Sequence, residues 1–484
     1  MKAISVLGTS SNSGKSWLAT ALCAWLRRKG VRVAPFKAQN MSNNSFVTWN
    51  GGEIGRAQAA QAEAAGLLPT TDMNPILLKP SGALGSQLVV EGKAQGHIKA
   101  ADYYRKVEHL WPVVTDCLDR WKQRCDVLVI EGAGSPVELN LKDRDLANLR
   151  PISHLDGRWL LVADIERGGV FAQIVGTSEL MPKSFLKQGL GVIVNKFRGD
   201  LSLFSEAGAL LRERTPLPYL GVLPFQANLQ PESEDSLCQE ADEQTTAGEK
   251  MAWIRFPHLS NSQDIQPWLR DEGVSVNWAS LSRDLDDARI IVLPGTKDTI
   301  ADLRWMRETG LADAIIRAVK RAVPVVGICG GLQMLGEHLS DPDGQAGEAA
   351  QVAGLGLLPV KTIFHHDKEV RQVTARWKND EWLAYEIHMG RTEGFASCSP
   401  LLNVGNNGEW KSEGWRVGKI WGTYLHGLFE SPAAREELAY LGGITNFRAA
   451  QGHWREHLQS VYHGMADLLD EHLDLKPLWH YVAD

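Results

Sequence analysis

The chain has 484 residues and a formal net charge of −7 at pH 7, with 44% hydrophobic and 23% charged residues. A chain of this length is too long for a single hydrophobic core, so we expect a globular protein of two or three domains. The negative net charge argues against a nucleic-acid partner, and no apolar run is long enough to span a membrane.

The cysteines and the N-terminus predict a reducing, cytoplasmic location. No two cysteines form a C-x-x-C pair, so neither a disulfide framework nor a zinc site is indicated. The first residues run directly into a strand and a Gly-rich loop instead of a signal peptide. The six cysteines are Cys23, Cys117, Cys125, Cys238, Cys329 and Cys398.

A phosphate-binding loop is predicted near the N-terminus. A short apolar strand, residues 4–7, precedes Gly8-Thr-Ser-Ser-Asn-Ser-Gly-Lys-Ser16, and an amphipathic helix follows. In this context the backbone N–H groups cradle nucleotide phosphates, Lys15 reaches the outer phosphates and the Ser16 hydroxyl joins a magnesium shell. The alternative is a Gly/Ser loop with a chance lysine. The predicted ATP ligands here are Gly8, Thr9, Asn12, Ser13, Gly14, Lys15 and Ser16.

Polar clusters follow the next predicted strands. The strand at 31–35 leads into a segment with Lys37 and Asn40, and Lys79 follows a later apolar run. Open α/β sheets bind ligands at the carboxyl ends of their strands, so these are candidate phosphate or substrate contacts. Simple turn chemistry is the alternative for the amides.

Glu131 ends the next buried strand and precedes a Gly-rich turn. A carboxylate at this place can bind Mg²⁺, or it can cap a helix. Residues 140–148 concentrate charges of both signs, and Arg144 among them is either a substrate contact or part of a solvated helical turn.

Further strands are predicted at 159–163, 189–194 and 220–224. Strands that alternate with helices over this length predict a parallel sheet covered by helices on both faces. The pair Asn195-Lys196 at the end of one of these strands resembles the base-recognition corner of P-loop proteins, which implies that Asn195 contacts the adenine edge of ATP.

A second domain is predicted after an acidic linker at 230–250. A strand at 289–293 leads into a turn at Gly295, and the apolar run 323–328 ends at Cys329. The predicted helix that follows continues through Leu332, Leu335 and Leu339. A cysteine on such a turn, before a helix N-terminus, favours thiolate, although a buried structural cysteine is the alternative.

His426 follows a later apolar strand and completes a Cys–His nucleophile with Cys329. Glu386, His388 and Arg391 lie on or beside an earlier strand, and His388 is the weaker candidate. Beyond about residue 447 the chain reads as helices without a chemical signature.

Three motifs in the second domain resemble class I glutamine amidotransferases: residues 293–299, 327–336 and 422–429. Most of that class has a glutamate two residues after the histidine, where this chain has Leu428, so the third member of the triad stays open. The resemblance implies an oxyanion hole near Gly295 and Gly330. The P-loop, with five residues between its glycines, resembles that of dethiobiotin synthetase.

Together these motifs make essentially the whole chain similar to the cobyric acid synthase family. The resemblance implies an α/β fold with two doubly wound domains, and we expect boundaries at 1–229, 230–250 (linker), 251–438 and 439–484 (helical extension). It also implies ATP, Mg²⁺ and glutamine, with four amidations of adenosylcobyrinic acid a,c-diamide through acyl phosphates. Cobyrinic acid a,c-diamide synthase and a P-loop regulatory ATPase with a vestigial amidotransferase domain are the alternatives. The expected partners are small molecules, without nucleic acid or membrane, and the oligomeric state stays open.

Overall fold

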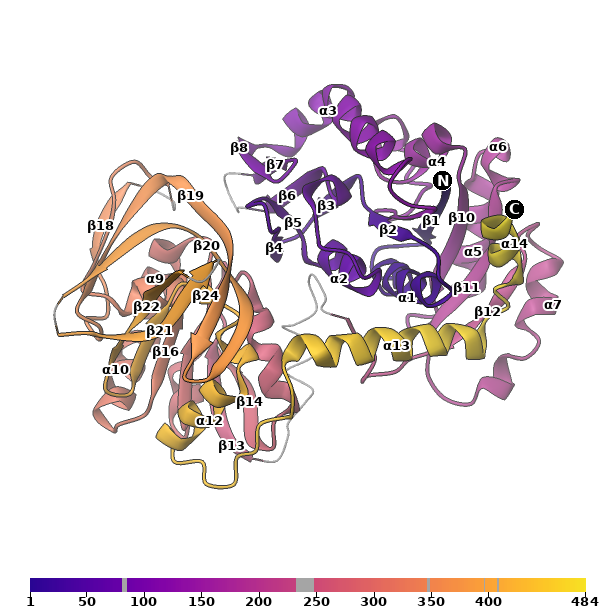
Figure 1. Cartoon of the computed structure of the whole chain (residues 1–484). Helices are drawn as coiled ribbons and strands as arrows, with labels where there is room; N and C mark the ends of the chain where they lie inside the picture. The colour runs from indigo at the N-terminus through magenta and orange to yellow at the C-terminus, as the bar shows by residue number, and fades with distance from the viewer. Residues whose placement is uncertain (81–84, 232–247, 346–348, 396, 407–408) are drawn as a thin grey trace. The chain divides into compact units, whose positions relative to one another are not determined.

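The computed structural model describes residues 1–80, 85–231, 248–345, 349–395, 397–406 and 409–484. It consists of two compact units (Figure 1). Unit 1 contains residues 1–42, 52–233 and 458–484, and unit 2 contains residues 43–51 and 234–457. Residues 232–247 of the predicted acidic linker, with Cys238, lie outside the described residues.

The six-stranded sheet of unit 1 is parallel throughout, in the order β12-β11-β10-β1-β9-β2. Its strands are near-continuous apolar runs because both faces are buried. The parallel register brings the ends of β1 and β9 to the same edge, where Val6 pairs with Glu131. The strands are β1 (Lys2–Gly8), β2 (Val33–Phe36), β9 (Val127–Glu131), β10 (Arg158–Asp164), β11 (Gly189–Phe197) and β12 (Tyr219–Pro224).

Helices and a smaller sheet complete unit 1. Apolar residues of the long helix α3 pack in one core with Leu128 and Ile130 of β9. The smaller sheet has the order β3-β6-β7-β8. The helices are α1 (Lys15–Arg28), α2 (Arg56–Ala64), α3 (Ala100–Trp121), α4 (Leu149–Leu155), α5 (Val170–Leu180), α6 (Lys183–Leu186) and α7 (Ala207–Arg212). The remaining strands are β3 (Gln39–Met41), β5 (Glu53–Gly55), β6 (Ile76–Pro80), β7 (Ser86–Val90) and β8 (Lys93–Ile98).

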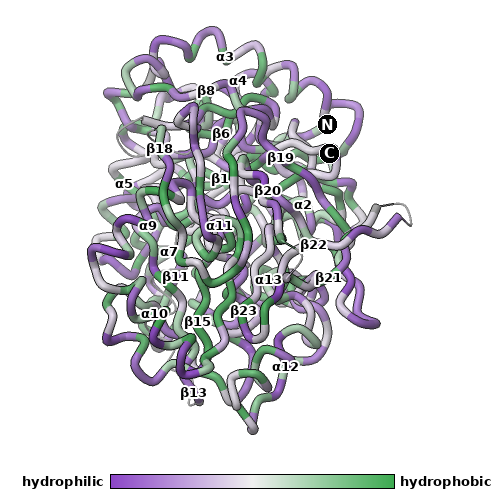
Figure 2. Tube along the Cα trace, turned by 90° about the vertical axis from the view of Figure 1, so that its left-hand side faces the viewer, coloured by the Kyte–Doolittle hydropathy of each residue, from purple (hydrophilic) through white to green (hydrophobic). Residues whose placement is uncertain are grey.

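Unit 2 joins a parallel sheet to antiparallel strands. Parallel pairing runs through β14-β13-β15-β16-β23, and antiparallel pairing continues from β23 to β22, β21 and β19. Figure 2 shows hydrophobic residues along β15 and β23. The parallel strands are β13 (Gly248–Ile254), β14 (Gly273–Ala279), β15 (Ile290–Leu293), β16 (Val325–Ile328) and β23 (Ile420–Thr423). The α/β class predicted from the sequence is confirmed in both units.

The antiparallel part, which the sequence did not predict, contains a long hairpin. Its strands β19 (Val360–Trp377) and β20 (Asp380–Gly394) pair along most of their length, and β20 also pairs with β24 (Leu425–His426). The other strands are β17 (His338–Asp341), β18 (Ala350–Ala353), β21 (Ser399–Asn406) and β22 (Glu409–Val417). The helices of unit 2 include 3₁₀ helix η5 (Ser262–Arg270), α9 (Thr299–Glu308), α10 (Leu311–Lys320), α11 (Gly330–Leu335) and α12 (Pro432–Leu441).

The helix after Cys329 is shorter than its apolar spacing predicts. It ends at Leu335, and Leu339 is a buried residue of strand β17 instead. Leu339 is buried in the same core as Leu332 and Leu335, so the spacing of these three leucines fitted a longer helix although Leu339 lies on a strand.

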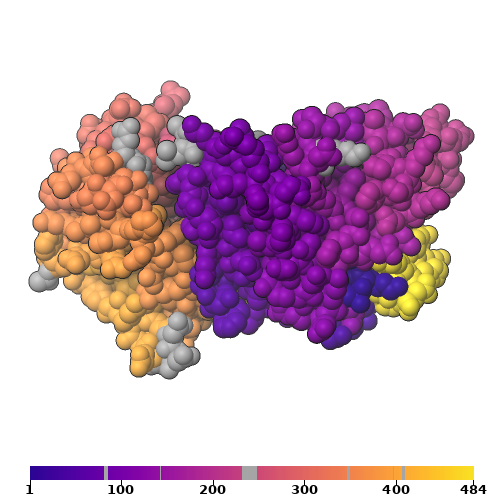
Figure 3. All heavy atoms as spheres, turned by 90° about the horizontal axis from the view of Figure 1, so that it is seen from above, coloured from indigo at the N-terminus to yellow at the C-terminus, as the bar shows by residue number. Residues whose placement is uncertain are grey.

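The structure divides the chain differently from the boundaries expected at 1–229, 251–438 and 439–484. The C-terminal residues 458–484, with most of α13 (Trp454–His472) and all of α14 (Lys476–Ala483), return to unit 1. The Tyr481 hydroxyl bonds to the backbone of Ala3, and Figure 3 shows the C-terminal residues in yellow beside indigo N-terminal ones. The short segment 43–51, with strand β4 (Ser45–Val47), belongs to unit 2 although its flanks lie in unit 1.

Within the described parts of the chain, no helix combines the length and the apolar character needed to cross a membrane.

Candidate active sites

The glycines of the phosphate loop are required by space. Gly14 has φ 100°, and a Cβ on it would lie 1.9 Å from Nδ2 of Asn195. A Cβ on Gly8 would lie 2.3 Å from Oγ of Ser13. The Asn195 amide donates to the Ser13 carbonyl oxygen at 3.1 Å. Asn195 therefore supports the conformation of the loop.

Lys15 is buried inside the loop without a carboxylate of its own. Its Nζ donates to the carbonyl oxygens of Ser10 at 2.9 Å and Gly134 at 3.0 Å. Burial lowers the pKa of Lys15 to about 8, with the charge of Glu131 raising it and that of Lys37 lowering it further. An anionic ligand at this ammonium would offset the cost of burying its charge.

Glu131 is the centre of a buried polar network beside the loop. Its Oε1 accepts hydrogen bonds from the Ser16 hydroxyl and from Nζ of Lys37, both at 2.7 Å. Its Oε2 accepts from Nε2 of Gln61 at 2.6 Å and of Gln58 at 3.2 Å. Burial opposes ionisation, but the Lys37 charge and these hydrogen bonds outweigh it and hold the pKa of Glu131 below its usual value. The four donors are all side-chain groups, so these contacts are not those of a carboxylate that caps a helix through backbone N–H groups.

Two members of this network, Gln58 and Gln61, were missed from the sequence. Both lie on α2 at a spacing of three, which places them on one helix face. The pattern Arg56-Ala-Gln-Ala-Ala-Gln61 contains that signal, but alanine neighbours make it look like an ordinary core helix.

The other candidates of unit 1 lie at different places. Asn40 donates through Nδ2 to Gln58 at 3.0 Å and so joins the Glu131 network. Lys79 instead makes a buried ion pair with Glu53 at 2.7 Å. Arg144 lies with its guanidinium 5.8 Å from the ring centre of Tyr104. Of the remaining loop residues, Thr9 donates through its hydroxyl to Gln173 of α5 at 2.9 Å, and Asn12 has φ 60°.

In unit 2, Cys329 occupies a sterically forced turn. Its backbone has φ 52° and ψ −106°, a conformation that a non-glycine residue rarely adopts. A Cβ on Gly331 would lie 1.9 Å from the Leu293 carbonyl oxygen, so the chain passes close to β15 at this point. The Cys329 N–H donates to the Thr423 carbonyl oxygen at 2.8 Å, which anchors the turn to β23.

The structure brings Cys329 and His426 together. Cys329 is close enough to His426 to contribute to the upward shift of its pKa. Nδ1 of His426 lies 2.8 Å from Oδ2 of Asp264, and both side chains are buried. Because Asp264 occupies Nδ1, the ring uses Nε2 toward the sulfur. Asp264 also accepts the Gly427 N–H at 2.6 Å.

Asp264 thus occupies the position that sequence reasoning left open. The chain has Leu428 two residues after His426, and the acid comes instead from η5, 162 residues earlier. No spacing in the sequence pointed to it, because its partner is set only by the fold.

The Asp264 carboxylate dominates the titration of His426. Burial alone would lower the pKa of His426, but the charge and hydrogen bond of Asp264, with a contribution from Cys329, raise it to about 10. This pKa keeps the imidazole protonated at neutral pH, and the buried Asp264 carboxylate carries the compensating negative charge.

The two oxyanion candidates lie beside this pair. A Cβ on Gly295 would lie 3.0 Å from Cε1 of His426, and one on Gly330 would lie 3.2 Å from the Thr296 backbone nitrogen. A side chain at either position would therefore crowd the site.

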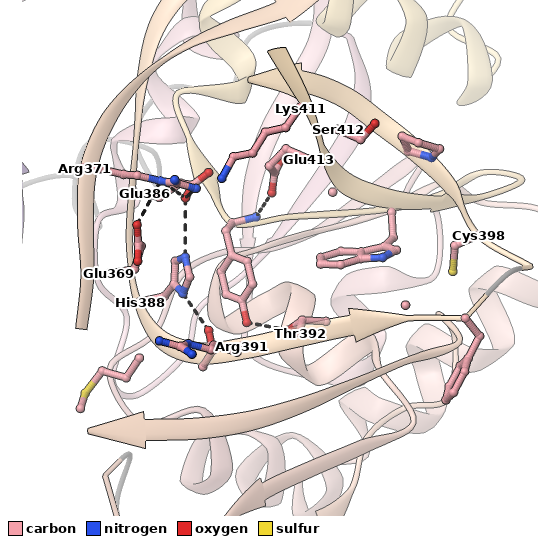
Figure 4. A pocket seen from close by; sticks show the side chains of 18 of the residues that line it. Glu369, Arg371, Glu386, His388, Arg391, Thr392, Cys398, Lys411, Ser412 and Glu413 are labelled. Carbon is pink, nitrogen blue, oxygen red and sulfur yellow. Dashed lines mark hydrogen bonds and ion pairs between the residues drawn. The ribbon is translucent and has the colours of Figure 1, made fainter. Parts of the chain in front are cut away.

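A pocket of about 570 Å³ opens next to Tyr424, lined mainly by residues of β20 and β22 (Figure 4). The His388 ring stacks on Tyr424 with 3.7 Å between centroids, and Nε2 of Gln333 donates to the Tyr424 hydroxyl at 3.4 Å. The pocket thus adjoins the helix that begins after Cys329.

Charges of both signs line this pocket. Figure 4 shows Arg371 bound to Glu386, with Lys411 and Glu413 nearby and Arg391 at the rim. Burial raises the pKa of Glu413 to about 7, although a Thr423 hydrogen bond opposes it. The lining suits a ligand that carries one positive and one negative group.

Comparisons with known proteins match both units. A model of the CobQ/CobB/MinD/ParA nucleotide binding domain matches residues 4–237, and one of the CobB/CobQ-like glutamine amidotransferase domain matches residues 250–434. The chain is 45% identical over 451 residues to the cobyric acid synthase of Roseiflexus castenholzii, covering 91% of each chain. It is 40% identical over 492 residues to that of a Synechocystis strain, covering 99% of this chain and 98% of the relative.

We expect Asp264→Asn to lower the pKa of His426 from about 10, because burial then acts without the opposing carboxylate charge. NMR titration of the histidine ring protons measures this pKa, with His426→Gln to assign the signal. Asp313→Asn, which changes an exposed acid of the same unit, is the matched control and should leave the titration unchanged.

The same shift has a consequence for stability. Because the folded-state pKa lies above the ordinary 6.5, the interaction contributes fully below that pH and is lost as the pH rises through about 10. The difference in unfolding free energy between the unaltered protein and Asp264→Asn should therefore become smaller as the pH rises from 6.5 to about 10. A pKa of His426 that stays the same in the variant would contradict the assignment.

Proposed function

The chain belongs to the cobyric acid synthase family, and from this premise we propose that it amidates the b, d, e and g carboxylates of adenosylcobyrinic acid a,c-diamide. Membership makes it a glutamine-dependent ligase of cobalamin biosynthesis. The observation that supports the two-step chemistry is that one chain holds a buried Lys15–Glu131 phosphate site and a Cys329–His426–Asp264 site. The identity to cobyric acid synthases favours these four carboxylates.

The first site has a chemical reason to be present. A carboxylate and ammonia do not condense in water because the oxide is a poor leaving group. Transfer of the γ-phosphoryl group of ATP to a carboxylate oxygen gives an acyl phosphate and ADP. Ammonia then attacks the acyl carbon, the amide forms and phosphate leaves.

In this proposal, residues of unit 1 bind and orient ATP. The loop from Gly8 to Ser16 encloses the phosphates with its backbone N–H groups, and Lys15 neutralises the outer ones. Lys37 and Asn40 lie in or next to the Glu131 network and are candidates for the carboxylate being activated. Asn195 remains a candidate for the adenine edge, while Lys79 and Arg144 remain weaker candidates for substrate contact.

Mg²⁺ fits the same place. Magnesium takes one or two protein ligands together with water and phosphate oxygens, and the Ser16 hydroxyl lies 2.7 Å from the Glu131 carboxylate. The part of the chain that the structure describes has no cluster of three or more histidine, cysteine or acidic side chains suited to a metal, so a site built around the nucleotide is the better match. When bound, the ion would offset the negative charge of the phosphates, and Ser16 and Glu131 would hold it.

The second site would release ammonia from glutamine. The Cys329 thiolate attacks the side-chain amide carbon, and the resulting oxyanion lies near the backbone N–H groups of Gly295 and Gly330. The amide C–N bond breaks as His426 gives its proton to the leaving nitrogen. Water then cleaves the thioester to glutamate, with His426 taking up the proton, while Asp264 keeps the ring oriented.

The pocket beside Tyr424 is our candidate for the amino and carboxylate groups of glutamine. Glutamine is a zwitterion, and the pocket lining carries both signs of charge. In this role Arg391 pairs with the carboxylate of the ligand, and the acidic residues pair with its ammonium group.

We expect Cys329→Ala to abolish glutamine-dependent amidation and to preserve amidation with ammonium at raised pH, because only the nitrogen supply is lost. Product formation from each nitrogen source measures this. Glutamine binding to the variant, followed by calorimetry, should persist since the pocket lining is unchanged. Strong residual use of glutamine would remove Cys329 from the mechanism.

Lys15→Ala should abolish amidation with both glutamine and ammonium, because phosphoryl transfer precedes the attack of nitrogen in either case. Lys187→Ala, which changes an exposed lysine of the same unit, is the control and should keep both activities. Retention of either activity in Lys15→Ala would show that the loop does not carry the reaction.

The mass of the corrinoid product tests which carboxylates react. Starting from adenosylcobyrinic acid a,c-diamide with ATP and glutamine, we expect a product with four additional amides. Cobyrinic acid a,c-diamide synthase uses the same chemistry and would instead add two amides to cobyrinic acid. Amidation of that precursor alone would overturn the substrate proposal and leave the two-site mechanism standing.

A further inference from the structure

The segment 43–51 reaches unit 2 from a region of the chain that otherwise builds the phosphate site. Asn40, just before it, bonds to Gln58, and Gln58, just after it, bonds to Glu131. The segment itself packs with unit 2. Residues 43–51 therefore belong to unit 2, while residues shortly before and after them in the sequence, Asn40 and Gln58, belong to the Glu131 network of unit 1.

The segment makes hydrogen bonds to two places beside the Cys329–His426 site. Asn43 accepts a hydrogen bond from Lys297, which follows the Gly295 turn. The Ser45 N–H donates to Oδ1 of Asn261 at 3.1 Å, and Asn261 immediately precedes the helix that carries Asp264. These two hydrogen bonds attach the segment to the turn after Gly295 and to the residue that precedes helix η5, which carries Asp264.

A series of packed rings leads from the segment to His426. The Phe46 ring lies 6.1 Å from the ring of Tyr385, and Tyr385 stacks on His426 with 5.1 Å between centroids and 16° between planes. Gln263, next to Asp264, donates to the Tyr385 hydroxyl. Phe46 is 2% exposed, so its ring is part of the packed interior.

Val47, the next residue, packs against the same strand, β20. Val47 shares an apolar cluster with Tyr385 and Ile387, and its carbonyl oxygen accepts from Nε2 of Gln372 at 2.7 Å. The Ile387 carbonyl oxygen lies 3.5 Å from the Cys329 sulfur. The segment thus backs the strand that faces both members of the Cys–His pair.

We propose that residues 43–51 act as a positioning strap for glutamine hydrolysis, with Phe46 as its main positioning residue. The inference rests on the proposed glutaminase role of Cys329 and His426. The strap touches Tyr385 and Asn261 and does not line the pocket beside Tyr424. It therefore acts on the orientation of the His426 ring and on the turnover rate, and not on glutamine binding.

We expect Phe46→Ala to lower kcat for glutamine hydrolysis by at least about tenfold, because small misplacements of a catalytic group cost one to two powers of ten in rate. KM for glutamine and amidation with ammonium should change by less than about twofold, since the pocket and unit 1 are untouched. Phe46→Leu, which keeps an apolar side chain of similar length, should recover part of kcat.

Trp49→Ala is the matched control. Trp49 belongs to the same segment and is also aromatic, but it is 61% exposed. This variant should keep the kcat of the unaltered protein. The pKa of His426, read by NMR, should shift in Phe46→Ala and stay unchanged in Trp49→Ala.

Asn261→Gly gives a second test if Phe46→Ala does not fold. Asn261 has φ 51°, which glycine adopts freely, so the change removes the acceptor of the Ser45 N–H without backbone strain. It should also lower kcat at constant KM. Unchanged kcat in a folded Phe46→Ala or Asn261→Gly, while Cys329→Ala loses glutamine use, would overturn the strap and leave the proposed function intact. Glutamine use by Cys329→Ala would instead overturn the proposed function.

Discussion

The ion pair between Asp264 and Nδ1 of His426 is the interaction on which the geometry of unit 2 depends. A buried imidazolium is unstable without an opposite charge, because desolvation favours the neutral ring. Asp264 supplies that charge and also accepts the Gly427 N–H, so one carboxylate fixes the ring and the backbone beside it. Its own position follows from η5, which begins after Asn261. Since Asn261 accepts the Ser45 N–H, the acid depends on a segment far away in the sequence.

The same electrostatic constraint shapes the phosphate site of unit 1. Glu131 is buried as a carboxylate, and such a charge is tolerated only where donors surround it. Lys37 supplies the charge, and Ser16, Gln58 and Gln61 supply hydrogen bonds from two further helices. The result is a preorganised polar site at the carboxyl edge of the parallel sheet, where the loop that carries Ser16 also begins. In both sites a buried carboxylate is held by groups that come from elements other than its own.

The local parts of these sites could be predicted because their physics is local. A Gly-rich loop between a strand and a helix, and a cysteine between a strand and two glycines, are forced by backbone sterics within a few residues. Asp264 could not be found this way, because only the fold brings it to His426. The sequence also could not predict that residues 43–51 belong to unit 2, because the asparagines of this segment resemble ordinary turn residues. A strand near Glu386 and Arg391 was predicted, but its long antiparallel pairing with β19 was not, because β19 is partly exposed and lacks a continuous apolar run.

A strap drawn from the ATP-binding part of the chain has a chemical logic in a reaction of this kind. Ammonia set free in water at neutral pH becomes ammonium, which is not a nucleophile, so hydrolysis of glutamine without an acyl phosphate wastes the nitrogen. The residues that flank the strap hold Glu131, directly through Gln58 and indirectly through Asn40. The chain that carries this network is covalently continuous with Phe46, whose ring packs at a tilt against Tyr385, and Tyr385 stacks on His426. Residues 43–51 thus connect the residues around Glu131 with those around His426 through a short stretch of chain, an arrangement that suits a reaction in which nitrogen release has to follow carboxylate activation.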